Sequence, residues 1–240
     1  MKSVLVTGGT VRLGSAIAAR LRAEGWRVIT SSHRADAGAD IVADLSEPMG
    51  AARLYAAALK LLGGNPPDAL VNNAALFTGD AAALAAVNLE APKKLTMLMA
   101  GRETGLGAVV NILDSVILGS LESIGSVPKD SNVPKVPEDS NDAKVPKDSK
   151  RPYLSSKREL AAFTRSAAAT FAATLRVNAV APGPVLAPTG VHVKAGETLL
   201  DRRPTSDDIA AAVSYLLSAE SVTGAIIPVD AGQHLLEAGA

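Results

Sequence analysis

Residues 3–15 read Ser3-Val4-Leu5-Val6-Thr7-Gly8-Gly9-Thr10-Val11-Arg12-Leu13-Gly14-Ser15. In this segment a short apolar run ends in a glycine-rich turn, and a helical pattern follows. Glycines let the backbone turn tightly and approach a pyrophosphate, and the free N–H groups at a helix start favour the anion. A strand, a glycine turn and a helix in this order are typical of a dinucleotide-binding unit. A nucleoside triphosphate site would need a lysine after Gly14, where this chain has Ser15.

Apolar runs and helical patterns continue to alternate along the chain. Most of the runs lack the period of two that a half-exposed strand shows, which indicates strands buried on both faces of a parallel sheet. The expected strands are 3–7, 27–31, 40–43, 68–72, 107–113, 174–181 and 225–229, and the expected helices are 13–24, 49–62, 81–101, 154–172 and 206–218. We therefore predict one α/β domain over residues 1–240: a Rossmann-like, doubly wound parallel sheet of about seven strands with helices on both faces.

The composition excludes several classes of protein. Its 24 basic and 24 acidic residues cancel, which argues against a nucleic-acid or membrane-surface binder. Cysteine is absent, so disulfides and cysteine-bound metals are excluded and a reducing, cytoplasmic compartment is expected. The three histidines show no metal-ligand spacing, and no metal is predicted. The N-terminus runs straight into the first strand, so we expect no signal peptide.

A low-complexity segment over 127–152 interrupts the pattern. It holds five prolines and eleven charged residues, and it repeats with a period of nine from Val127, Val136 and Val145. Such a composition disfavours both a strand and a core helix. The segment is interpreted as an inserted, flexible surface loop, with a lid or docking segment as the alternative.

The end of the second expected strand indicates the cofactor. An acidic residue here would bind the adenosine ribose hydroxyls of NAD, but the chain has His33 and Arg34. A guanidinium can hold a 2′-phosphate through two hydrogen bonds, so NADPH/NADP is predicted.

Six motifs in order make the chain resemble the short-chain dehydrogenase/reductase family. They are the turn at 7–14, Asp44-Leu45, Asn72-Asn73-Ala74, Asn88, Tyr153 with Lys157, and the segment 176–183 ending in Pro182-Gly183. The resemblance implies cofactor contacts from Gly8, Thr10, Arg12, Leu13, Gly14, His33, Arg34, Asp44, Leu45, Asn72, Asn73, Ala74, Lys157, Pro182, Gly183 and Val185. It also implies a homotetramer or homodimer, and it places the repeat immediately before Tyr153.

Three departures from the family pattern resemble its pteridine reductase branch. Arg12 replaces a turn glycine, Asp114 stands in the place of the catalytic serine, and Phe77 follows the Asn-Asn-Ala element. In that branch the aromatic ring stacks on the pterin. The implied substrate-binding residues are Phe77, Arg12, Asp114 and Tyr153, and the implied catalytic residues are Asp114, Tyr153, Lys157 and Asn88.

Tyr153 and Lys157 are four positions apart and share a face of a helix. A nearby ammonium would lower the tyrosine pKa from its usual value of about 10 and ease proton transfer. Asp114 is expected to orient Tyr153 or to pass a proton through water. Asn88 is expected to hold a water that links Lys157 to solvent, and Arg12 to contact the pyrophosphate or the substrate.

The combined prediction is an NADPH-dependent reductase of a dihydropterin-like heterocycle, with no nucleic-acid or membrane partner. Two alternatives remain. The first is a carbonyl or 3-oxoacyl reductase of the same family that acts on a ketone. The second is a non-catalytic dinucleotide sensor or scaffold that works through the repeat.

Overall fold

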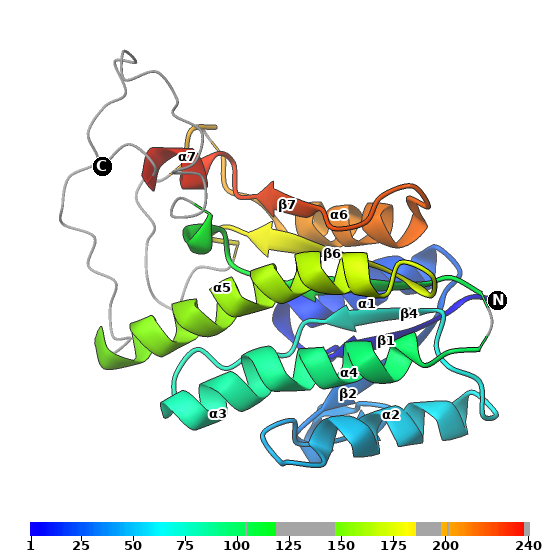
Figure 1. Ribbon diagram of the computed structural model, residues 1–240. Coiled ribbons are helices and arrows are strands. Elements are labelled where there is room, and N and C mark those ends of the chain that lie inside the picture. The colour runs from blue at the N-terminus through cyan, green and yellow to red at the C-terminus, as the bar shows by residue number, and fades with distance from the viewer. Residues whose placement is uncertain (104, 119–146, 186–197, 201, 238–240) are drawn as a thin grey trace.

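The computed structural model describes residues 1–103, 105–118, 147–185, 198–200 and 202–237 (Figure 1). Most of the repeat segment, up to residue 146, lies outside these residues. Among the helices described, none is both long and apolar enough to cross a membrane.

The centre of the molecule is a parallel sheet of seven strands in the order β3-β2-β1-β4-β5-β6-β7. The strands are β1 (Ser3–Thr7), β2 (Arg27–Ser32), β3 (Ile41–Val42), β4 (Ala69–Asn72), β5 (Gly107–Ile112), β6 (Leu175–Pro182) and β7 (Ile226–Val229). All seven predicted strands are present, and the predicted Rossmann-like fold is confirmed. The strand order reverses between β1 and β4, where such a sheet leaves a crevice for a ligand.

Helices cover both faces of the sheet, as Figure 1 shows. The long helices are α1 (Arg12–Ala23), α2 (Gly50–Leu61), α4 (Ala91–Ala100), α5 (Lys147–Thr170) and α6 (Ser206–Ser218). Successive strand residues point to opposite faces. Leu5 of β1 therefore packs with Leu54 of α2 and Leu95 of α4, in a cluster that α5 also joins. Its neighbours Val4 and Val6 pack with α1 and α6 on the other face.

Short elements complete the chain and modify two predicted helices. The short elements are the 3₁₀ turns η1 (Ala35–Ala37) and η3 (Ser115–Ile117) and the helix α7 (Gln233–Glu237). The predicted helix 81–101 divides into α3 (Ala81–Ala85), a π-helical turn η2 (Ala86–Glu90) and α4. A π turn holds one extra residue, and this one contains the fully buried Asn88.

The start of α5 corrects one expectation. The helix was predicted from 154 but begins at Lys147, so the last six residues of the segment 127–152 are helical. Lysine and arginine are good helix formers. Pro152 removes only one backbone hydrogen bond from a helix whose later turns pack against β6.

A buried arginine ties β6 to the end of α6. Arg176 donates through its guanidinium to the carbonyl oxygens of Leu216 and Leu217 at 2.8 Å, and to that of Val222 at 3.2 Å. Leu216 and Leu217 lie in the last turn of α6, where a helix has no internal donors and favours a cation, and Val222 follows the end of the helix. Arg176 therefore fixes α6 against the sheet.

Replacing Arg176 with methionine should lower the free energy of unfolding by about 2–4 kcal/mol, because the buried carbonyl groups of Leu216 and Leu217 and the half-buried one of Val222 lose a charged donor. Urea denaturation measures the change. Arg165→Met, at an exposed position of α5, is the matched control and should change it by less than about 0.5 kcal/mol. Equal unfolding midpoints for the two variants would contradict the capping role.

Candidate active site

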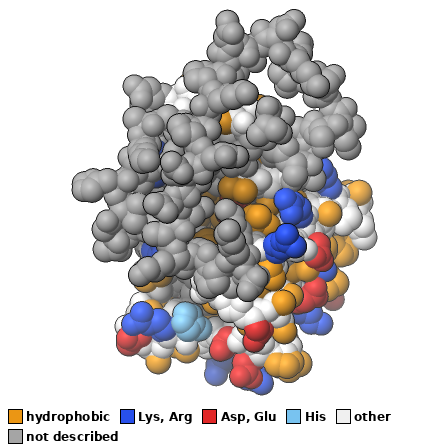
Figure 2. Space-filling model, turned by 90° about the vertical axis from the view of Figure 1, so that its left-hand side faces the viewer, with side chains coloured by type: hydrophobic (Ala, Val, Ile, Leu, Met, Phe, Trp, Pro, Cys, Tyr) orange, Lys and Arg blue, Asp and Glu red, His pale blue; other side chains and the backbone are white. Residues whose placement is uncertain are grey.

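A cavity of about 580 Å³ opens at the edge of the sheet where the strands end. Figure 2 looks onto this edge and shows hydrophobic side chains in its middle and charged side chains towards its lower end. Most of the predicted site residues line the cavity: Gly8, Thr10, Arg12, Leu13, Gly14, His33, Arg34, Asp44, Leu45, Asn73, Ala74, Phe77, Asp114, Tyr153, Lys157, Pro182, Gly183 and Val185. Asn72 and Asn88 are not part of this lining.

The glycine turn is held against the end of β4. Asn73 donates through Nδ2 to the carbonyl oxygens of Thr7 and Gly8 at 2.9 and 3.0 Å. The Thr7 hydroxyl accepts from the backbone N–H groups of Asn73 and Ala74. A side chain at Gly14 would overlap the carbonyl oxygen of Gly8, so only glycine permits this close approach. Asn73 thus shapes the turn through its side chain.

Arg12 occupies the turn with a backbone that L-residues seldom adopt. Its φ is +51°, in the left-handed region where glycine is favoured. Its exposed side chain stands beside the cavity. Arg12 therefore adopts a backbone conformation that is costly for a non-glycine residue, and such strain tends to occur at functional sites.

Asn72 and Asn88 lie outside the cavity lining and hold neighbouring segments in place by hydrogen bonds. Asn72 donates to Asn111 Oδ1 at 2.8 Å, and Asn111 donates to Thr164 of α5 at 2.9 Å. Asn88 exchanges two hydrogen bonds of 2.8 Å with the backbone of Leu76, next to Phe77. It also donates to Ser156 of α5 at 3.4 Å. Both asparagines therefore join α5 to the strand ends and loops that form the cavity.

One end of the cavity carries a cluster of charges. Arg34 follows β2, and its guanidinium donates to both carboxylate oxygens of Asp36, at 3.0 and 2.7 Å. Asp44 accepts from the hydroxyl and the backbone N–H of Ser46, and these bonds, with a smaller effect from His33, hold its pKa below the usual value. The predicted phosphate-binding arginine is thus already paired with a neighbour.

Tyr153 and Asp114 meet near the middle of the cavity. Asp114 follows β5, as predicted for a residue at the carboxyl edge, and its Oδ1 accepts from Val116 N–H at 3.1 Å. The Tyr153 hydroxyl donates to the remaining oxygen, Oδ2, at 2.8 Å. This bond fixes the direction of the Tyr153 hydroxyl in the structure.

The pKa of Tyr153 moves opposite to the expected direction. Burial, together with the charge of Asp114 and the hydrogen bond to it, raises the pKa of Tyr153 far above its ordinary value. Lys157 shares the helix face as predicted, with Nζ 5.9 Å from the centre of the Tyr153 ring. Its ammonium donates instead to the Ile112 carbonyl at 2.8 Å, and burial lowers the pKa of Lys157 to about 8. In this arrangement Tyr153 is a neutral phenol.

Phe77 stands over Tyr153 at the opening of the cavity. The two ring centroids are 5.3 Å apart and the planes are tilted by 33°. Phe77 is 53% exposed, although large apolar side chains usually pack. Phe77 therefore lines the cavity with about half of its side chain open to solvent.

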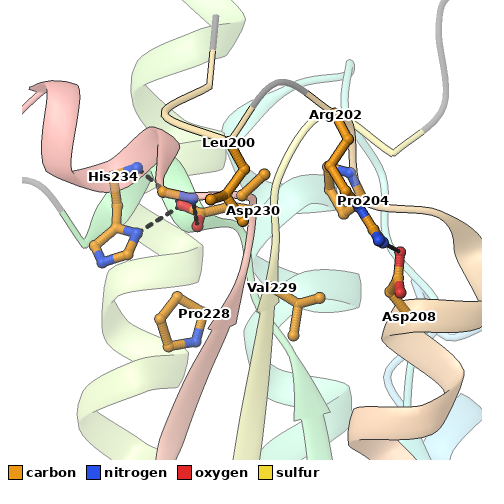
Figure 3. A pocket seen from close by; sticks show the side chains of 10 residues that line it. Leu200, Arg202, Pro204, Asp208, Pro228, Val229, Asp230 and His234 are labelled. Atoms are coloured by element: carbon orange, nitrogen blue, oxygen red, sulfur yellow. Dashed lines mark hydrogen bonds and ion pairs between the residues drawn. The ribbon is translucent and has the colours of Figure 1, made fainter.

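A second cavity of about 350 Å³ lies beyond β7 (Figure 3). Asp230 and His234 stand on one side of it and the Arg202–Asp208 ion pair on the other. Asp230 accepts from the backbone N–H groups of Gly232 and His234 and is bonded to the His234 ring at 2.7 Å. A Cβ at Gly183 would lie 2.5 Å from the Asp230 Cβ, so this turn sets the path of 182–185 along the main cavity.

Sequence reasoning missed two of these supporting residues. Asp36 lies two positions after Arg34, and this spacing of opposite charges was a usable signal. Asp230 follows the last strand, and nothing in the sequence indicated that Gly183 packs against it.

Known reductases and dehydrogenases are similar to this chain. A family model described as enoyl-(acyl carrier protein) reductase matches residues 139–234. The putative ketoacyl reductase 2 of the granaticin polyketide synthase from Streptomyces violaceoruber is 32% identical over 97% of this chain and 96% of its own. Glucose 1-dehydrogenase 2 of Bacillus subtilis is 29% identical over 98% of this chain and 95% of its own.

The solved structures include that of FolM alternative dihydrofolate reductase 1 from Brucella canis, complexed with NADP. It aligns with a TM-score of 0.77 and 29% identity over 98% of this chain and 94% of that one.

The depressed pKa of Lys157 predicts a pH-dependent stability in the protein without ligand. Between pH 8 and about 9.5 the unfolded chain keeps a lysine proton that the folded chain has released, so the free energy of unfolding rises with pH. The rise, relative to Lys157→Met, should approach about 1.4 kcal/mol per pH unit. Denaturant titrations at stepped pH measure it.

Lys60→Met removes an exposed lysine of α2 and provides the control. It should leave the pH dependence of the wild-type protein intact. A wild-type curve parallel to that of Lys157→Met over this range would show that Lys157 keeps an ordinary pKa.

Proposed function

The chain belongs to the short-chain dehydrogenase/reductase family, and from this premise we propose that it reduces a dihydropterin-like heterocycle with NADPH. It is an NADP-dependent oxidoreductase of this family. The observation that carries the proposed substrate is the exposed Phe77 ring, 5.3 Å from the Tyr153 ring that is bonded to Asp114.

The cavity suits a dinucleotide. Its volume falls within the range of about 300–1,000 Å³ that small-molecule sites occupy. Close packing of Gly14 on Gly8 keeps this turn compact, and α1 begins there, where the N–H groups of a helix start favour a pyrophosphate. Arg34 would hold the 2′-phosphate, and the segment 182–185 would hold the nicotinamide end. When bound, NADPH supplies the hydride for the reduction.

Tyr153 is the group we assign to deliver the proton. Its high pKa keeps the proton on the hydroxyl until a basic substrate atom approaches. Asp114 directs that hydroxyl, since its other oxygen is fixed by Val116. The Lys157 ammonium, 5.9 Å from the ring centre, would stabilise the phenolate left behind. Asn88 would act by holding the loop that carries Phe77.

Phe77 would distinguish a flat heterocycle from a flexible ketone. Aromatic rings stack in offset or tilted pairs worth about 0.5–1.5 kcal/mol beyond the area they bury. The exposed Phe77 ring offers such a partner, and Arg12 also lines the cavity. The alternative dihydrofolate reductase among the solved structures supports this substrate class.

A ketone reductase remains the second candidate. The relative from Streptomyces violaceoruber is named a ketoacyl reductase, and Tyr153 with Lys157 would serve a carbonyl equally well. The proposal also includes a homodimer or homotetramer and a cytoplasmic location, with which the absence of cysteine agrees.

Phe77→Ala separates the two candidates. In the wild-type protein we expect 7,8-dihydropterins to be turned over with NADPH and more slowly with NADH. Phe77→Ala should lower kcat/KM for the dihydropterin by about tenfold to a hundredfold, because stacking and apolar burial are both lost. For a small ketone, kcat/KM of the same variant should fall by less than about threefold. Loss of NADPH absorbance measures both reactions.

Phe77→Tyr keeps the ring and is the matched control, so it should retain most of the dihydropterin activity. Equal losses for both substrates in Phe77→Ala would remove the stacking argument. Turnover of ketones alone would favour the second candidate.

A further inference from the structure

Asp36 stands directly beside the arginine assigned to the cofactor phosphate. It lies in the 3₁₀ turn η1, just outside the cavity wall, between the lining residues Arg34 and Ala37. We propose that Asp36 is a specificity-determining residue that competes with the 2′-phosphate for Arg34 and so moderates the preference for NADPH over NADH. This inference rests on the proposed function, because it requires NADP(H) in the main cavity.

Asp36 occupies the guanidinium donors of Arg34 that a phosphate would use. Arg34 Nε and one terminal nitrogen donate to the two oxygens of Asp36, at 3.0 and 2.7 Å. This is the side-by-side pairing that a guanidinium also forms with phosphate. A bound 2′-phosphate must therefore displace Asp36 or use the opposite edge of the guanidinium. In both cases the carboxylate stays close to the phosphate.

The pair is exposed, so it can open at little cost. The side chains of Arg34 and Asp36 are 61% and 70% exposed. Exposed ion pairs contribute little to stability because water and salt screen them. Displacement is thus feasible, and the main effect of Asp36 is the charge that it leaves beside the phosphate.

The neighbouring charges do not offset this repulsion. Two carboxylates lie at this end of the cavity: Asp36, whose pKa Arg34 lowers through its hydrogen bonds and its charge, and Asp44, whose pKa the hydrogen bonds from Ser46 lower. Against these two negative charges Arg34 supplies one positive charge, so the three groups carry a net charge of about −1 before the cofactor arrives. A phosphate adds close to two negative charges, whereas the ribose hydroxyl of NADH adds none. Removing the charge of Asp36 should therefore act on NADPH alone.

Asp36→Asn tests the inference by direct binding. Dissociation constants for NADPH, NADP⁺, NADH and NAD⁺ are measured by calorimetry or by the fluorescence of the reduced cofactors. The variant should bind NADPH about three- to tenfold more tightly, with NADH changed by less than about twofold. The gain should shrink as salt is raised, because screening weakens the repulsion that the variant removes.

Glu47→Gln is the matched control. It removes one exposed carboxylate from the loop after β3, outside the cavity lining. The dissociation constants of NADPH and NADH should each change by less than about twofold. Weaker or unchanged NADPH binding by Asp36→Asn would overturn the inference, because Asp36 would then orient Arg34 or have no effect. A specific loss of NADH binding would overturn it too, as Asp36 would then accept from the ribose.

The failures can be told apart. If neither wild type nor variant binds NADPH, the inference and the assigned cofactor fall together. If NADPH binds and Asp36→Asn tightens it while no dihydropterin is reduced, the inference stands and only the proposed substrate is wrong.

Discussion

The parallel direction of the sheet is the constraint on which the site depends. All seven strands end at one edge of the sheet. The segments that follow β1, β2, β4, β5 and β6 therefore meet there, although they are far apart in the sequence. The buried apolar residues of these strands pack on both faces of the sheet and so hold the strand ends in place. The crevice between β1 and β4 then follows from strand order, and Asn73 ties the two strand ends together across it.

The position of α5 determines whether Tyr153 and Lys157 reach Asp114 at that edge of the sheet. Tyr153 and Lys157 come from this helix, whereas Asp114 comes from the sheet, so proton delivery depends on how the helix sits on β5. Two buried polar connections fix it: Asn72 through Asn111 to Thr164, and Asn88 to Ser156. Buried amides have few alternative partners, so such connections specify one arrangement. Asn72 and Asn88 thus hold α5 in place relative to the site by hydrogen bonds.

Much of this was predictable from the residues, for identifiable reasons. Most strands carry a continuous apolar run, which marks them clearly in the sequence. The glycine turn is likewise recognisable from its residues. The start of α5 was not predictable, because the charged residues and the proline at 147–152 are equally typical of loops. Nor was the raised pKa of Tyr153, since the spacing from Tyr153 to Lys157 places both on one face but does not say where the hydroxyl points. That direction is set by Asp114, which is 39 positions away.

The central claim is that Phe77, Tyr153 and Asp114 form one site for a flat heterocycle beside the nicotinamide. A crystal structure of the protein with NADP⁺ and a pterin tests it most directly. The account predicts the pterin stacked between the Phe77 ring and the nicotinamide, with a ring nitrogen or the exocyclic oxygen in hydrogen-bond reach of the Tyr153 hydroxyl. A pterin bound away from Phe77, or a Tyr153 hydroxyl turned away from both Asp114 and the ligand, would contradict it.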